Sequence, residues 1–261
     1  MKTIKIKFCD FWSHWNQEDN FIINVLKKKY NVVISEEPDY IFFSNFNEDF
    51  QHMDYNDCVK IFYTQENIVP DFNYADYGIG FDEIQYADRY MQYPIYLIKE
   101  RYGKYWSLMK DKHILEMPEK YCERGFCSYV VSNGNADEIR KYAFEKLCNY
   151  KKVDSGGKYM NNIDQPEGVE DKLEFAKKHK FSLCFENTSH PGYTTEKIVE
   201  AFAAKTIPIY WGDPSVTKIF NSKAFVNVAD YDSLDDMVVA VQEIDENQEL
   251  YLKMLQTPAL K

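Results

Sequence analysis

The sequence predicts an α/β protein built from two doubly wound, Rossmann-like parallel sheets. Apolar runs that are too short for helices recur between amphipathic helical segments, and this alternation is typical of parallel sheets. Polar residues also gather where several of these runs end. At 261 residues the chain has room for two domains of ordinary size.

The clearest unit lies at residues 181–212. An apolar run at 181–185 predicts a buried strand, and a loop rich in turn residues follows it. Thr194 is the predicted cap of a helix whose apolar positions recur at helical spacing, and a second strand is expected at 206–211. Together these segments predict one βαβ unit.

The same patterns assign the other elements. Before the central unit we predict strands at 3–8, 31–35, 40–44, 59–63 and 126–132, helices at 19–30, 137–150 and 170–179, and a flexible loop at 153–158. The inner face of the first helix is expected to carry Phe21, Ile22, Val25 and Leu26. After the central unit we predict a strand at 224–228 and a helix that starts at Ser233.

Residues 99–123 are highly charged and lack a clear period, so the domain boundary is predicted near Pro118. The predicted domains are therefore residues 1–118 and 119–245. The tail, 246–261, is expected to be helical, with the N-terminal domain as the surface on which it could pack back.

Composition limits the classes of protein and of site. The net charge of −11 argues against a general nucleic-acid binder, which needs a basic face. The N-terminus lacks a secretory apolar region, and no run of 18 apolar residues is present. We therefore expect a cytoplasmic protein whose six cysteines are reduced and form neither disulfides nor a metal site.

Polar side chains follow the strand at 181–185, where parallel α/β sheets bind ligands. They are Glu186, Asn187, Tyr193, Glu196 and Lys197. A cation in the first helical turn, as expected for Lys197, opposes the helix dipole. A bound phosphate would remove that conflict, so this loop is a candidate anion site.

Two further side chains lie near predicted strand ends or helix starts. Glu66 follows the strand at 59–63, and a carboxylate in a partly apolar cleft has a raised pKa and can act as a general base. The alternative is an exposed carboxylate. Arg140 is expected in the first turn of its helix, where a diphosphate would compensate its charge; the alternative is a solvated surface arginine. Asp230-Tyr231-Asp232 has the D-x-D form of a metal site, but acidic residues are expected at a helix start anyway.

Three segments resemble the motifs of one enzyme family. FSLCFENTSHPGYTTEKIVEAFAAKTIPIYWG resembles the donor-binding signature of the α-1,3-fucosyltransferases, glycosyltransferase family 10. FYTQENIVPDFNYADYGIGFD resembles the N-terminal-domain motif of that family, and FCSYVVSNGNADEIRKYAF resembles the entry into its second domain. The motifs occur in the family's order over residues 59–215, and the chain is similar to the bacterial members.

The resemblance implies a GT-B architecture, with the active site in a cleft between two Rossmann-like domains. GDP-fucose would bind the C-terminal domain, and the acceptor sugar would lie against the N-terminal one. Glu66 matches the general base of the family. The donor-binding positions are Arg140 and Lys197 on the diphosphate, Tyr193 beside them, Glu196 on the ribose, and Asn187 and Glu186 as further contacts. No metal or other cofactor is implied.

The function predicted from this resemblance is the inverting transfer of L-fucose from GDP-β-L-fucose to O3 of GlcNAc in a Gal-GlcNAc acceptor, which makes Lewis x-type glycans. The alternatives are a GT-B transferase that uses another nucleotide sugar, and an inactive glycan-binding protein of the same fold. The candidate acceptor residues are Tyr93, Tyr96, Trp12 and His14. Peripheral contact with the inner membrane is expected if a basic C-terminal tail follows. The choice between α-1,3 and α-1,4 linkage, the natural acceptor and the oligomeric state stay open.

Overall fold

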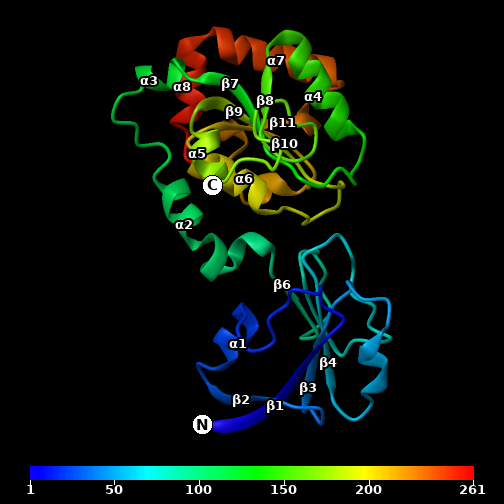
Figure 1. Cartoon of the computed structure of the whole chain (residues 1–261). Coiled ribbons are helices and arrows are strands. Elements are labelled where there is room, and N and C mark those ends of the chain that lie inside the picture. Colours follow the sequence, from blue (N-terminus) through cyan, green and yellow to red (C-terminus); the bar gives the residue numbers. More distant parts are fainter. The chain divides into compact units, whose positions relative to one another are not determined.

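The structure is a computed structural model that describes all residues, 1–261. The chain divides into two compact α/β units, a first unit of residues 1–100 and a second unit of residues 101–261 (Figure 1). This division differs from the predicted boundary near Pro118. The reason is packing: Tyr102 and Met109 of helix α2 (Lys99–Lys110) are buried, and Tyr105 of the same helix packs on the core of the second unit.

The elements follow one another in the order drawn in Figure 1. In and just after the first unit they are β1 (Lys2–Cys9), α1 (Phe21–Leu26), β2 (Tyr30–Ile34), β3 (Tyr40–Phe43), η1 (Gln51–Asp54), β4 (Val59–Tyr63), β5 (Tyr77–Gly80), β6 (Tyr90–Gln92), η2 (Ile95–Leu97) and α2. The rest of the second unit contains α3 (Glu119–Cys122), β7 (Gly125–Tyr129), α4 (Ile139–Tyr150), β8 (Val153–Ser155), α5 (Lys172–Ala176), β9 (His179–Phe185), α6 (Glu196–Ala203), β10 (Ile207–Trp211), η3 (Val216–Lys218), η4 (Ser222–Ala224), β11 (Val226–Asn227), η5 (Val228–Asp230), α7 (Leu234–Glu246) and α8 (Gln248–Leu255).

The first unit is built on a six-stranded parallel sheet with the order β2-β1-β3-β4-β5-β6. Neighbouring residues of a strand face opposite sides, so each strand supplies two cores. Phe42 packs with Ile22 and Ile23 of α1 on one side, whereas Ile41 and Phe43 pack in a separate cluster on the other. Both faces of the sheet are therefore covered, as a parallel sheet requires.

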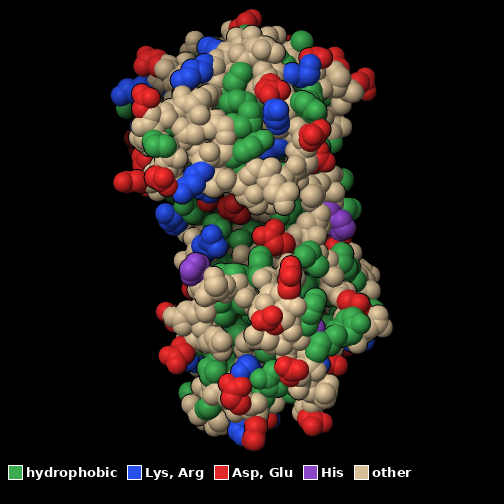
Figure 2. Space-filling view, turned by 45° about the vertical axis from the view of Figure 1, so that its right-hand side comes forward, with side chains coloured by type: hydrophobic (Ala, Val, Ile, Leu, Met, Phe, Trp, Pro, Cys, Tyr) green, Lys and Arg blue, Asp and Glu red, His purple; other side chains and the backbone are tan.

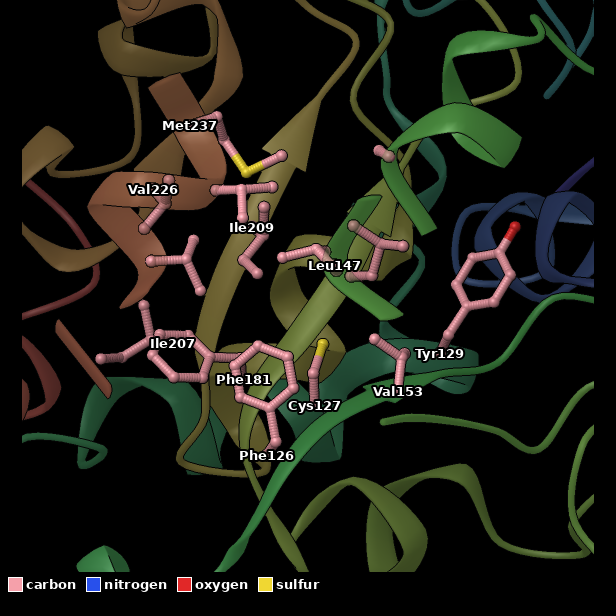
Figure 3. Packing of buried hydrophobic residues seen from close by; sticks show 14 of the residues in the cluster. Phe126, Cys127, Tyr129, Leu147, Val153, Phe181, Ile207, Ile209, Val226 and Met237 are labelled. Carbon is pink, nitrogen blue, oxygen red and sulfur yellow. The ribbon is translucent and has the colours of Figure 1, made fainter. Parts of the chain in front are cut away.

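The second unit has a five-stranded parallel sheet with the order β11-β10-β9-β7-β8. Its main core joins strands β7, β9 and β10 to helices α4, α7 and α8, while α5 and α6 pack together elsewhere on the sheet. Figure 3 shows Phe126 and Phe181 of neighbouring strands side by side, with ring centroids 5.6 Å apart, close to Ile207. This apolar layer holds β7, β9 and β10 in register.

Most predicted elements are present, and the differences have local causes. The βαβ unit at 181–212 is confirmed as β9, α6 and β10, but Thr195 rather than Thr194 is the N-cap of α6, and its side chain does not cap the helix. Helix α1 is shorter than predicted. The buried face of the helix is formed by Ile22 and Ile23, and Val25, which was expected on that face, is 52% exposed. The predicted flexible loop contains strand β8, and strands β5 and β6 were not predicted.

The C-terminal tail is helical, as predicted, and packs within the second unit. Tyr251 and Leu255 of α8 are fully buried in the main core. The backbone carbonyl of Leu255 also accepts a hydrogen bond from the buried ammonium of Lys112, at 2.8 Å. Helix α8 is therefore part of the second unit, not an appendage.

The surface carries charges of both signs. On the face shown in Figure 2, acidic and basic side chains are interspersed. The lysines and arginines form no continuous basic area there. None of the helices combines the length and the apolar character that a membrane span requires.

Candidate active site

The predicted donor-binding residues lie at one edge of the second sheet. Strands β7, β9 and β10 are adjacent and parallel, so the loops after them meet at their carboxyl ends. Arg140 follows β7, and Asn187, Glu196 and Lys197 follow β9. Arg140 donates a hydrogen bond to Asn187, and the charge of Lys197 acts on its neighbour Glu196.

Arg140 is the second residue of α4, and only 1% of its surface is exposed. Its Nη1 donates to the backbone oxygen of Asn133 at 3.1 Å, and its Nη2 donates to Oδ1 of Asn187. No acidic side chain pairs with it, and its Nε has no hydrogen-bond partner. The alternative of a solvated surface arginine is therefore wrong: this is a buried cation without a counter-charge.

Lys197 has a counter-charge inside the protein. Its Nζ lies 2.9 Å from Oε2 of Glu186 and 2.9 Å from Oγ1 of Thr195. Glu186 is fully buried, and its Oε1 accepts from the backbone N–H of Thr195 at 2.7 Å, at the start of α6. The conflict between Lys197 and the helix dipole is thus resolved by a carboxylate of the chain itself. Glu186, predicted to contact the donor, instead uses both oxygens within the protein.

The charges around the start of α6 influence one another. Burial alone would lower the pKa of Lys197, but Glu186 and Glu196 raise it by more, so the lysine stays protonated. Burial would raise the pKa of Glu196, but Lys197 and other nearby cations lower it by more. One turn further along the helix, burial and then the charge of Glu196 raise the pKa of Glu200 to about 7.

Asp213, just after β10, holds the loop between β9 and α6 in place. Its Oδ1 accepts from the backbone N–H of Gly192, and its Oδ2 accepts from Oγ1 of Thr194, each at 2.8 Å. Tyr193, between these two residues, is only 2% exposed. No sequence signal distinguishes Asp213, which lies between a glycine and a proline, from an ordinary turn residue.

Glu66 lies at the carboxyl edge of the first sheet, two residues after buried Thr64. Its backbone N–H donates to Oγ1 of Thr64 at 3.1 Å, and this hydroxyl donates to Oδ1 of Asn45, after β3, at 2.6 Å. The segment that carries Glu66 is therefore anchored to the ends of two neighbouring strands. Its side chain is partly exposed, as a group that accepts a proton from a substrate must be.

Aromatic rings collect at the same edge of the first unit. Trp12 is partly exposed and makes edge contacts with Trp15 and Phe46, with ring centroids 4.8 and 5.1 Å apart. Trp15 and Phe46 are not among the predicted residues, because loop positions show no period that would single them out.

The other candidate acceptor residues differ in exposure. His14 is exposed, and Tyr93 is partly exposed and stacks on Phe21. Tyr96, however, is only 2% exposed, so little of its surface is open to an acceptor in this structure. It follows Pro94 closely, and the η2 turn directs it into the protein interior.

The structure contains no group of three or more His, Cys, Asp or Glu side chains placed to hold a metal ion. Asp230, the first residue of the D-x-D sequence, accepts a hydrogen bond from Nδ2 of Asn227 at 3.0 Å. This contact links the carboxylate to strand β11, which accounts for an acidic residue at this position.

Comparison with known proteins covers nearly the whole chain. The model of the "Alpha-(1,3)-fucosyltransferase FucT N-terminal domain" matches residues 6–99, and that of "Glycosyltransferase family 10 (fucosyltransferase) C-term" matches residues 99–256. The alpha-(1,3)-fucosyltransferase FucT of Helicobacter pylori is 33% identical over 97% of this chain, which spans 59% of that relative. A putative fucosyltransferase of Acanthamoeba polyphaga mimivirus is 32% identical over 51% of this chain and 24% of its own length.

Solved structures agree with this assignment. A crystal structure of an alpha1,3-fucosyltransferase with GDP-fucose matches all of this chain and 83% of its own, with 32% identity and a TM-score of 0.82. Anabaena HepE in complex with UDP-glucose matches at 9% identity with a TM-score of 0.57, which supports the fold alone. The expected two-domain GT-B fold is thus confirmed, and the chain belongs to glycosyltransferase family 10, the fucosyltransferases.

Proposed function

We propose that this protein transfers L-fucose from GDP-β-L-fucose to O3 of the GlcNAc in a Gal-GlcNAc acceptor, with inversion at the fucose anomeric carbon. The second unit would bind the donor, and the first unit would bind the acceptor. One observation carries the donor site: Arg140 is a buried cation without an acidic partner, at the same sheet edge as Lys197. Family membership and the GDP-fucose in a related structure support the same assignment.

The charge of Arg140 gives a chemical reason for a diphosphate at this site. A buried guanidinium that lacks a counter-ion is costly, because neutral oxygens replace only part of its hydration. A nucleotide diphosphate at the sheet edge would supply the missing negative charge. As fucose departs, negative charge grows on the diphosphate, so Arg140 and Lys197 stabilise the transition state more than the ground state.

The remaining roles follow from position. Glu66 accepts the proton of the acceptor hydroxyl, that oxygen attacks the anomeric carbon, and GDP leaves with the pair of electrons of the broken bond. The carboxylate of Glu196 stays ionised beside Lys197 and is suited to accept hydrogen bonds from ribose hydroxyls. The partly exposed ring of Trp12 offers a face to an acceptor sugar.

We also propose a cytoplasmic location, with peripheral contact at the inner membrane where a basic segment is present. Its support is chemical: all six cysteines are free thiols, which suits a reducing compartment.

Calorimetric titration of GDP and GDP-fucose, with and without EDTA, tests the donor assignment. We expect binding that resists EDTA and weakens about tenfold or more in Lys197→Ala, because a charge-assisted phosphate contact is lost. Lys141→Ala, an exposed lysine on α4, is the matched control and should bind like the wild type. Binding of UDP or CMP sugars in place of guanine nucleotides would refute GDP-fucose as the donor. Failure to bind any nucleotide would favour the inactive glycan-binding protein.

A further inference from the structure

We propose that Glu186 is a positioning residue that fixes the ammonium of Lys197 and directs its remaining N–H at the donor diphosphate. The inference rests on the proposed function, because it names how that site is kept ready. It also changes the role of Glu186 from a contact with the donor to a support for the residue that makes one.

Glu186, Thr195 and Lys197 make a closed set of side-chain contacts. Oε2 of Glu186 accepts from Oγ1 of Thr195 at 2.7 Å and from Nζ of Lys197 at 2.9 Å. The same Thr195 hydroxyl oxygen accepts from Nζ of Lys197 at 2.9 Å. Glu186, Thr195 and Lys197 therefore form a ring of hydrogen bonds in which each side chain touches the other two.

One hydrogen-bonding direction of the Lys197 ammonium is left free within the protein. An ammonium has three N–H donors, and two of them are used by Glu186 and Thr195. The Lys197 side chain is 20% exposed, whereas Glu186 is fully buried. One N–H of Lys197 is thus available to a ligand, and the buried carboxylate decides where it points.

The side chain of Glu186 is also confined sterically by Gly212. A methyl group at Gly212 would lie 2.4 Å from Cγ and 2.7 Å from Cβ of Glu186, so only glycine leaves room for this side chain. Gly212 also has a φ of +154°, in the region that favours glycine. The backbone N–H of Glu186 donates to the oxygen of Trp211 at 2.9 Å. The side chain of Glu186 is therefore packed against Gly212, with its carboxylate hydrogen-bonded to Thr195 at the start of α6.

The physical consequence is preorganisation. A free lysine side chain loses rotamer entropy when it is immobilised on a ligand. Here the loss occurs on folding, and Glu186 offsets the cost of burying the charge. The diphosphate then meets an ammonium that is already oriented, which is the arrangement that makes electrostatic stabilisation of a transition state effective.

A double-mutant cycle tests whether Glu186 acts through Lys197. We expect Glu186→Gln to weaken GDP binding about tenfold in the wild-type background and less than about twofold in the Lys197→Met background. Thr195→Val, which removes only the shared hydroxyl, should behave in the same way and covers the case in which Glu186→Gln does not fold. Equal losses in both backgrounds, or no loss in either, would overturn the proposal.

A second measurement does not depend on nucleotide binding. Titration of the Lys197 ammonium, followed by ¹⁵N NMR of labelled lysine, should show a clearly lower pKa in Glu186→Gln, with partial recovery in Glu186→Asp. Glu196 and Tyr193 also act on Lys197, and both residues are kept in every variant. If the wild type bound no GDP, the proposed function would fail, while this titration would still decide whether Glu186 controls Lys197. An unchanged pKa in Glu186→Gln would refute that control.

Discussion

Oδ1 of Asn187 accepts a hydrogen bond from Nη2 of Arg140, so the loop after β9 holds the cation at the start of α4. The backbones are joined as well, because the N–H of Asp137 donates to the oxygen of Asn187 at 2.8 Å. Asn187 holds the guanidinium through a neutral amide oxygen, which leaves its charge uncompensated. A carboxylate in this position would form a salt bridge and neutralise that charge.

Asn187→Asp should therefore separate stability from donor binding. The new carboxylate would pair with buried Arg140, and we expect a raised Tm together with GDP binding weakened about tenfold or more. Thermal unfolding and calorimetry measure the two effects. Asn221→Asp, at a side chain whose Oδ1 only accepts from the backbone N–H of Lys223, keeps that hydrogen bond and controls for an added negative charge. Tighter GDP binding in Asn187→Asp would contradict the role of Arg140.

Glu66→Gln should abolish transfer while donor binding is kept. Loss of a general base reduces turnover by about 10²–10⁴-fold, and an amide cannot take the proton of the acceptor hydroxyl. Steady-state kinetics with GDP-fucose give kcat, and calorimetry gives the affinity for GDP. Glu37→Gln makes the same change at an exposed glutamate of the same unit and should leave kcat and the affinity for GDP unchanged. A full kcat in Glu66→Gln would exclude Glu66 as the base.

Trp12→Ala should weaken the acceptor but not the donor. Loss of an aromatic face corresponds to about 0.5–1.5 kcal/mol, so we expect the KM for the acceptor to rise about 2–13-fold with little change in the KM for GDP-fucose. Tyr74→Ala, which removes a half-exposed ring of the same unit, is the control. An unchanged acceptor KM would remove Trp12 from the acceptor surface.

Lys112→Met should change the pH dependence of stability. Burial lowers the pKa of Lys112 to about 7, below its ordinary value of 10.5, so the unfolded chain holds this proton more tightly. The resulting loss in the free energy of unfolding is largest below about pH 7 and disappears as the pH rises to about 10.5. We therefore expect Lys112→Met to be more stable than the wild type near pH 6–7, with the advantage shrinking toward pH 10.

At high pH the order should reverse, because the variant lacks the hydrogen bond from Lys112 to Leu255, worth about 1 kcal/mol. Denaturant unfolding between pH 6 and 10 measures the difference. Lys110→Met, two residues earlier and exposed, is the control and should follow the wild-type curve. A constant difference across this range would show that Lys112 does not titrate in the folded protein.

The local elements were largely predictable. The βαβ unit at 181–212 combines an apolar run, turn residues and a helical period, all of which are written in neighbouring residues. Ser233 caps α7 by accepting from the N–H of Asp236, at the predicted start of the helix. Strands β5 and β6 are four and three residues long, so they show too few positions for a period to appear.

The sequence by itself determined the fold class, the family motifs and the positions of Glu66, Arg140 and Lys197, because these depend on short-range patterns. Only the tertiary structure decided that Arg140 is buried without a counter-ion, while Lys197 forms an ion pair with Glu186. Both results depend on which strand ends lie side by side in the sheet. A cation's partner is set by distances in space, and neither spacing along the chain nor the helix dipole could identify it.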